Sequence, residues 1–396
     1  MLSKPHVWRA LESKADVLAS YQRTSSDELE QFQVLLARLA ALGAQEIRAA
    51  VADVARPGAL PSCEREAGRA VARPFAPRWE NHEQARAWAM SVLRDTPTIA
   101  VDGSQITPSR DFSIPVGAVQ VAWFENAHNA AGDYVKDLRF EVLGPNELAD
   151  DAPDSGDRSA FPDRQVNLRR FELECQMLCE AMRRYAGRDP LPVCFLDGSL
   201  IVSFAAQMRP ELQGRYVGCV RDLLDTSERT RVPVVGYIDT SYSKDMVALL
   251  AHLGQRALPL TLSDGFLLSR AMQWGDRSEA FVCARDDQVF AKAPDLAYYD
   301  RVLLVYCKTT ADNPPARLDL PAWVLEAGLL DDVLDVVRAE CIVGTGYPYA
   351  AETADAVAVI TAADREHFYR TLQEFAEQLG VELHYAHKAY SKRGRR

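Results

Sequence analysis

The segments IAVDGS at residues 99–104 and CFLDGS at residues 194–199 decide the fold, because each carries an apolar run directly into the same Asp-Gly-Ser tripeptide. Each copy places one carboxylate, Asp102 or Asp197, where a hydrophobic strand meets a glycine that lets other backbone or a ligand approach closely. Asp-Gly is also a strong turn signal, so one copy alone would be explained equally well by a tight turn. Two copies, each after a hydrophobic strand, favour paired carboxylates that meet at one site.

Two carboxylates at one site repel each other unless a cation lies between them. The ligands would be hard oxygen atoms without a Cys/His cluster, which favours Mn²⁺ or Mg²⁺ over zinc. Such ions can polarise a scissile phosphate, lower the pKa of a bound water and stabilise a leaving oxygen. The repeated tripeptide therefore predicts a metal site for phosphoryl chemistry.

Short β-rich runs surround both tripeptides and alternate with helical stretches farther along the chain. The runs around the first tripeptide are separated by turn residues and predict an antiparallel meander. Strands that first pair as hairpins and then alternate with helices indicate an α/β fold with a mixed sheet flanked by helices. The expected strands are residues 98–101, 116–124, 138–142, 193–196, 234–238 and 302–306, and the expected helices are residues 168–185 and 364–379.

The chain is expected to divide along its length. Residues 1–94 form a helical N-terminal arm in this prediction, and both a packing element and a partner surface are compatible with its apolar periodicity. Residues 95–380 form the main domain, with an acidic, Pro/Asp/Ser-rich and mobile loop at about residues 144–166. Residues 381–396 are a basic C-terminal tail, for which a solvated end is favoured over a phosphate contact.

Composition excludes several classes of protein. The formal net charge is -11, so the chain has no broad positive field. Any contact with nucleic acid must therefore come from local basic clusters. The eight cysteines include no C-x-x-C pair and most lie in apolar runs, which argues against structural zinc and for a reducing compartment. No stretch approaches the length that crosses a bilayer, so a cytoplasmic protein without a membrane contact is expected.

An ordered set of motifs gives the sequence a resemblance to a known family. Together with the two Asp-Gly-Ser copies, the set resembles the NurA nuclease domain over roughly residues 95 to 378, and the order of the motifs is more specific than any one of them. The further motifs are Gly236-Tyr-Ile-Asp-Thr-Ser-Tyr-Ser-Lys244, Leu262-Ser-Asp264, Gly275-Asp-Arg-Ser278, Pro315-Ala-Arg-Leu-Asp-Leu-Pro321 and Gly346-Tyr-Pro-Tyr349.

The resemblance implies both a fold and an activity. The fold would be ribonuclease-H-like and related to the Piwi nuclease domain, and the protein would be a homodimer that works with a HerA-type hexameric ATPase translocase in DNA end resection. The activity would be Mn²⁺- or Mg²⁺-dependent cleavage of DNA ends or single-stranded DNA, as a 5′–3′ exonuclease with single-strand endonuclease activity. Asp102 and Asp197 match the two metal-binding aspartates of the family.

The resemblance also implies a helical glutamate before the second aspartate, in the segment Phe171-Glu172-Leu173-Glu174. Glu172 shares a helix face with Leu168, Cys175 and Cys179, so we expect it to point inward as the third metal ligand, whereas Glu174 points to solvent. The alternative is that Glu172 is only a helix carboxylate at the edge of an apolar stripe.

Tyr347 matches the tyrosine of the family's Gly-Tyr-Pro motif. Eight residues later the family usually has a histidine, whereas this chain has Asp355. Aspartate ligates Mn²⁺ well but cannot donate a proton at neutral pH as histidine does. We therefore expect Asp355 to be a further metal ligand, and the alternative is a catalytically weak NurA-like scaffold for the translocase.

Three basic residues are candidate DNA contacts. Lys244 corresponds to the family's lysine and could hold a phosphate as a point charge, with a surface lysine as the alternative. Arg277 and Arg317 could line the DNA path, and each is equally compatible with a structural ion pair.

An actin-like phosphotransferase is a second alternative, because that superfold also places Asp-Gly pairs around a nucleotide phosphate. The chain has no adenosine-binding motif beyond the Asp-Gly turns, which makes this function the weaker hypothesis.

Overall fold

A computed structural model describes residues 2–67, 70–109, 111–149, 163–291 and 293–383. The chain is a mixed α/β protein that forms two compact units. Unit 1 contains residues 1–85, 198–201 and 236–334, and unit 2 contains residues 86–197, 202–235 and 335–396. The units therefore interleave along the sequence.

Unit 2 is built on a mixed sheet with the strand order β6-β3-β4-β5. Strands β3 and β6 are parallel, whereas β3/β4 and β4/β5 are antiparallel, so the predicted meander is confirmed. The strands are β3 (Thr98–Ile106), β4 (Gly117–Asn126), β5 (Tyr134–Leu143) and β6 (Val193–Asp197). β3 is longer than expected because it continues through the first Asp-Gly-Ser as regular strand instead of turning there.

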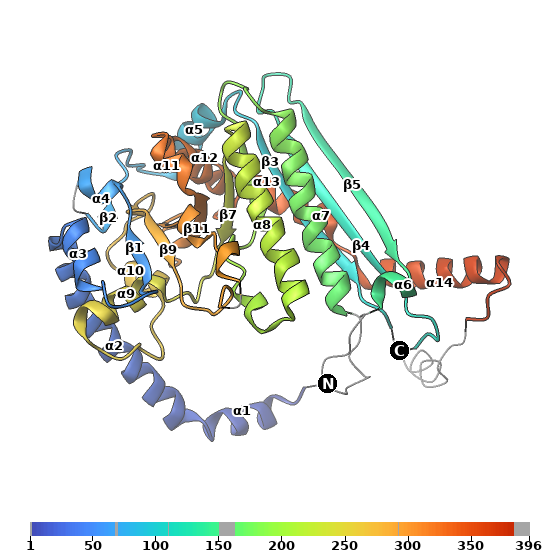
Figure 1. The fold of residues 1–396 in the computed structure, drawn as a ribbon, viewed down its shortest axis with the longest axis horizontal. Helices are drawn as coiled ribbons and strands as arrows, with labels where there is room; N and C mark the ends of the chain where they lie inside the picture. Colours follow the sequence, from blue (N-terminus) through green and yellow to red (C-terminus); the bar gives the residue numbers. More distant parts are fainter. Residues whose placement is uncertain (1, 68–69, 110, 150–162, 292, 384–396) are drawn as a thin grey trace. The chain divides into compact units, whose positions relative to one another are not determined.

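Helices cover both faces of this sheet. Gln105 of β3 donates a hydrogen bond to Asn167 of α7, whereas Gln120 of β4 donates to main-chain oxygens of α13. Gln120 lies opposite Ser104, and side chains at 104 and 105 point to opposite faces of the strand, so α7 and α13 flank the sheet on opposite sides (Figure 1). The helices of this unit include α7 (Asp163–Arg184), α8 (Pro210–Thr230), α13 (Tyr349–Ala358) and α14 (Ala362–Gln378).

Unit 1 holds an antiparallel sheet with the order β1-β9-β10-β11, and β11 pairs with residues 236–238 of β7. Two short strands, β2 and β8, extend it beside β10. The strands are β1 (Gly58–Pro61), β2 (Ala72–Arg73), β7 (Val234–Ile238), β8 (Arg277–Ser278), β9 (Phe281–Ala284), β10 (Val302–Cys307) and β11 (Ala316–Pro321). The core strands β10 and β11 are buried along their whole length.

The N-terminal helices also belong to unit 1. The second half of α2 buries an apolar stripe against α9, so this part of the predicted arm is a packing element. The stripe consists of Leu29, Phe32, Leu35, Leu36 and Leu39. The helices of this unit include α1 (Lys4–Glu12), α2 (Ala15–Ala41), α3 (Ala44–Ala50), α4 (Glu64–Ala67), α9 (Asp245–Gly254), α10 (Asp264–Leu268) and α11 (Ala322–Glu326).

Some predicted segments lie partly or wholly outside the described residues. Of the expected mobile loop at 144–166, residues 145–148 form the short helix α6 and residue 163 begins α7, while residues 150–162 are not described. Most of the basic tail, residues 384–396, is likewise outside the description. Within the described parts of the chain, none of the helices has the length and apolar character needed to span a bilayer.

Candidate active site

Asp102 and Asp197 lie side by side on neighbouring parallel strands of unit 2. Val101 of β3 is paired with Leu196 of β6, and the two aspartates are the next residues on the two strands. Residues in register on adjacent parallel strands project from the same face and are separated by roughly 5 Å across the ladder. The geometry therefore brings the two predicted carboxylates together.

Two further residues reach these carboxylates from the α13 side of the sheet. Asp355, on α13, is hydrogen-bonded to Asp102. Tyr347 lies in the turn before α13, and its hydroxyl donates a hydrogen bond of 2.5 Å to Oδ1 of Asp197. Four of the predicted site residues thus lie near the end of β6 in two contacting pairs, Asp102 with Asp355 and Asp197 with Tyr347.

The Asp102 carboxyl is strongly perturbed. Burial raises the pKa of Asp102 to about 6, and the neighbouring negative charges of Asp197 and Asp355 act in the same direction. A hydrogen bond between two carboxyl groups requires a shared proton, which compensates for charge repulsion. A divalent cation would supply the same compensation and release that proton.

Glu174 of α7 is the third acidic side chain coupled to this pair. It is only 6 % exposed, lies 3.3 Å from Nη1 of Arg170, and interacts electrostatically with Asp102 and Asp197. Burial raises the pKa of Glu174 to about 8. Gly103 makes this approach possible, because a Cβ at that position would lie 2.5 Å from Oε1 of Glu174.

The predicted orientation of the two helical glutamates is wrong. Glu172 is partly exposed and bound by Arg169 and Arg215, with a distance of 2.8 Å from Nε of Arg215 to its Oε1. Helix α7 packs against both β3 and α8, so its buried arc is wider than one stripe. Glu174 lies within that arc, on the same helix face as Met177 and Leu178, and Glu172 lies outside it.

The donor set fits a hard divalent cation, although its side chains are not gathered around one point. All the donors are carboxylate oxygens, and Oε1 of Glu174 is buried without a hydrogen-bond partner. In the described part of the chain, no three His, Cys, Asp or Glu side chains are already placed to hold one ion. Asp102, Asp197 and Asp355 would hold the ion on the α13 side, with side-chain adjustment, and Glu174 lies beside them across Gly103.

A comparison with protein families identifies the family of the chain. The family model described as the NurA domain matches residues 96–360, a segment that contains both strands and every acidic residue of the site. The chain belongs to the NurA domain family. No curated protein matches the chain.

Two solved NurA structures resemble this NurA-domain chain. "Crystal structure of NurA with manganese" has 11% sequence identity and a TM-score of 0.43, and the match covers 72% of this chain and 89% of that one. "Crystal structure of NurA" has the same identity and TM-score, with 71% and 88% covered.

The three predicted DNA contacts of this NurA-domain protein all lie in unit 1, where other groups engage them. Lys244 donates from Nζ to the carbonyl oxygens of Pro259 and Leu260, at 2.7 and 2.8 Å. Its ammonium group therefore stabilises the loop that contains Pro259 and Leu260.

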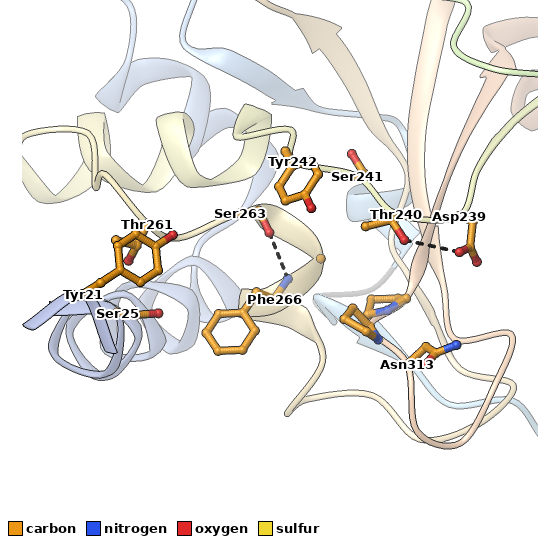
Figure 2. A pocket seen from close by; sticks show the side chains of 13 residues that line it. Tyr21, Ser25, Asp239, Thr240, Ser241, Tyr242, Thr261, Ser263, Phe266 and Asn313 are labelled. Carbon is orange, nitrogen blue, oxygen red and sulfur yellow. Dashed lines mark hydrogen bonds between the residues drawn. The ribbon is translucent and has the colours of Figure 1, made fainter. Parts of the chain in front are cut away.

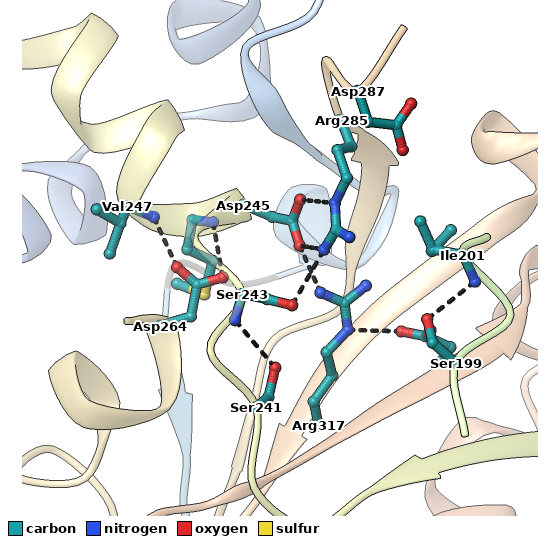
Figure 3. A network of polar contacts seen from close by, with 12 residues as sticks. Ser199, Ile201, Ser241, Ser243, Asp245, Val247, Asp264, Arg285, Asp287 and Arg317 are labelled. Carbon is teal, nitrogen blue, oxygen red and sulfur yellow. Dashed lines mark hydrogen bonds and ion pairs between the residues drawn. The ribbon is translucent and has the colours of Figure 1, made fainter. Parts of the chain in front are cut away.

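Arg277 and Arg317 are buried in ion pairs. Arg277 binds Glu64 and Asp331 at 2.7 and 2.8 Å. Arg317 binds Asp245 at 2.5 Å (Figure 3) and also binds Asp319 at 2.8 Å. The geometry of both arginines matches the structural ion-pair alternative, and neither guanidinium group is exposed for a phosphate contact.

Sequence reasoning missed the group that anchors the segment after Asp197. Oγ of Ser199 and the backbone N–H of Leu200 both donate to Oδ2 of Asp319, at 2.5 and 3.1 Å. Tyr298 donates from its hydroxyl to the Leu200 carbonyl oxygen at 2.8 Å. Asp319 lies in the Arg-Leu-Asp motif, whose alternation of charged and apolar residues was the available signal.

A separate pocket of about 410 Å³ lies in unit 1 (Figure 2). Its walls carry the rings of Tyr21, Tyr242 and Phe266, together with several hydroxyl groups. Among the described residues that line it, Asp239 is the only charged one, so none of these supplies a cation that favours a phosphate.

Proposed function

We propose that this NurA-domain protein is a divalent-metal-dependent deoxyribonuclease. One observation carries the proposal: Asp102 and Asp197 are adjacent, in register, on parallel strands β3 and β6. Burial and the neighbouring charges of Asp197 and Asp355 make the ionised form of Asp102 unfavourable, which is the condition that a bound cation relieves.

The chain's own residues hold the ion and prepare the site. Asp102, Asp197 and Asp355 are the proposed ligands, and the Tyr347 hydroxyl orients Asp197 through its hydrogen bond. Glu174 approaches from the other face of β3 beside Arg170; with its pKa raised to about 8 by burial it is mostly protonated at neutral pH, and a bound cation would favour its ionised form. Bound Mn²⁺ or Mg²⁺ would polarise the phosphate and activate water for in-line attack.

The substrate and the partners come to the proposal from the family resemblance. We propose 5′–3′ exonuclease action on DNA ends, with single-strand endonuclease activity, by a homodimer that works with a HerA-type translocase. The net charge of -11 supports a need for delivery, because the chain as a whole repels DNA and a motor could feed the strand to the site.

Digestion of linear duplex and single-stranded DNA, labelled separately at each 5′ and 3′ end, tests the activity. With Mn²⁺, the wild-type chain should shorten the strands from their 5′ ends, and EDTA should stop the reaction. Loss of label from the 3′ end first would contradict the polarity. An absence of cleavage with both metals, with and without the translocase, would contradict the nuclease assignment.

A catalytically weak scaffold remains the second candidate, favoured by the scattered placement of the acidic side chains and by Asp355. Asp355→His distinguishes the two functions, because a metal ligand at this position tolerates imidazole. A nuclease should keep or increase its Mn²⁺-dependent cleavage in this variant. Unfolding of the variant would instead give Asp355 a purely structural role. The family match adds no observation in favour of the phosphotransferase.

A further inference from the structure

Strand β5 ends the strand order of unit 2, and no described strand pairs with its outer edge (Figure 1). It is ten residues long and pairs with β4 along its whole length. Most of its residues are exposed. A long, open and exposed edge is a template for pairing with another strand.

The main-chain groups at this edge have a defined pattern. The Ala127 N–H donates to the Asp133 carbonyl oxygen at 3.1 Å. This residue pair continues the register of the β4/β5 ladder by one step beyond the pair Asn126 and Tyr134. Because hydrogen-bonded and non-hydrogen-bonded pairs alternate in an antiparallel ladder, odd-numbered residues of β5 bond to β4. The N–H and C=O groups of the even-numbered residues therefore point to the open edge. Leu138 agrees, since its N–H donates only to the adjacent Asp137 side chain, at 2.8 Å.

Four of the five even-numbered residues of β5 also carry exposed apolar side chains, and the fifth is Lys136. Tyr134, Leu138, Phe140 and Val142 project from one face of β5 and are 44 % to 63 % exposed. Exposed apolar side chains gathered along an open edge mark an interaction surface.

Charge selects the partner and the register. In an antiparallel pair of two β5 strands, even-numbered residues of one copy must lie opposite even-numbered residues of the other. Only then can their outward N–H and C=O groups form hydrogen bonds with each other. Centring the pair on residue 137 or residue 139 would oppose Asp137 or Arg139 to its own copy. Centring the pair on Leu138 places Asp137 of each copy opposite Arg139 of the other copy. These are non-hydrogen-bonded pairs, in which the two residues lie closer together, and all the paired residues 134–142 are within β5.

The other attractive register is centred on Phe140 and opposes Arg139 to Glu141. It pairs fewer residues of β5, and Glu141 is already bound by Arg169, at 2.8 Å. The register centred on Leu138 is therefore the more complementary one.

We propose that a second copy of this chain adds to the sheet of unit 2 through antiparallel β5–β5 pairing, with Leu138 at the two-fold axis. The apolar side chains of both copies then lie on one face across the axis, with Tyr134 opposite Val142 and Lys136 opposite Phe140 of the other copy. This surface and register specify the homodimer of the proposed function and do not rest on its cleavage activity.

Charge reversal tests the pairing on the full chain, by sedimentation without metal or DNA. Wild type should form a dimer, and Asp137→Arg or Arg139→Asp alone should raise the dimer dissociation constant by about tenfold or more, because each creates two repulsive pairs. The double variant should regain wild-type affinity, because the attractive pairs return with exchanged partners. A monomeric wild type, or a dimer unaffected by the single reversals, would overturn the proposal.

Cross-linking tests the register, in a Cys63→Ser background that removes the exposed native thiol. Leu138→Cys should give a covalent dimer on mild oxidation, since opposite Cα atoms lie about 5 Å apart, within disulfide reach. Val142→Cys alone should not cross-link, whereas a mixture of Tyr134→Cys and Val142→Cys chains should. Cross-linking of Val142→Cys to itself, without Leu138→Cys cross-linking, would contradict the register. Because neither assay measures cleavage, a failure here is distinguishable from a failure of the nuclease proposal.

Discussion

The Ser199 hydroxyl donates a 2.5 Å hydrogen bond to the buried carboxylate of Asp319, whereas the described structure shows no side-chain hydrogen bond for Ser104, its counterpart in the first Asp-Gly-Ser. The two copies are therefore held in place differently. The first is held within strand β3, and the second is tied by its serine to the Arg317–Asp319 ion pair.

Ser199→Ala should lower the free energy of unfolding by about 1–3 kcal/mol, because a buried carboxylate loses a hydrogen-bond donor. The matched change Ser104→Ala should alter it by less than about 0.5 kcal/mol. Urea unfolding at neutral pH measures both values. Equal effects of the two substitutions would show that the hydrogen bond to Asp319 does not distinguish the copies.

Asp102→Ala or Asp197→Ala should abolish Mn²⁺-dependent cleavage and leave the fold intact. Each change removes a ligand, and relief of charge repulsion offsets the loss of contacts. Gel assays of cleavage and circular dichroism of the same preparations provide the check. Cleavage near the wild-type rate in either variant would exclude that aspartate as a ligand.

Glu174→Gln should slow cleavage by about 10- to 100-fold, because groups supporting a metal site typically contribute that much. Glu172→Gln is the control on the same helix, and it should leave the rate nearly unchanged because Glu172 is engaged by Arg169 and Arg215. Single-turnover rates at saturating Mn²⁺ compare the two. The opposite order of effects would restore Glu172 as the third carboxylate.

The metal-free protein should lose stability as the pH rises from about 4 to about 8. Burial raises the pKa of Asp102 to about 6 and that of Glu174 to about 8, so their protonated forms favour folding fully below the unfolded pKa of about 4. That contribution is lost as the pH rises through the folded values. Urea unfolding in EDTA should show a smaller loss for Glu174→Gln than for wild type. Identical pH profiles would mean that Glu174 titrates normally.

Much of the fold follows from local patterns in the sequence. The strand at 234–238 was predicted with its observed bounds because it is a short apolar run, and the helix at 364–379 was displaced by at most two residues because its apolar residues recur with a helical period. The short strands β1 and β9 were not predicted, since four residues leave little periodicity to detect. The interleaving of the two units also has no local signal, because it depends on long-range pairing such as that of β11 with β7.

The site was predictable where chemistry and strand pattern coincide. The meeting of Asp102 and Asp197 followed from two identical tripeptides after two hydrophobic strands. The choice between Glu172 and Glu174 failed because helix periodicity gives the buried face only when all packing partners are known, and α7 packs against both the sheet and α8. Arg317 resembled a DNA contact because the sequence does not show that Asp245, far along the chain, neutralises it.

Anomalous diffraction from crystals soaked in Mn²⁺ tests the central claim most directly. The account predicts a peak about 2.0–2.4 Å from carboxylate oxygens of both Asp102 and Asp197. A peak bound elsewhere, or a fully loaded ion that contacts only one of these aspartates, would contradict it.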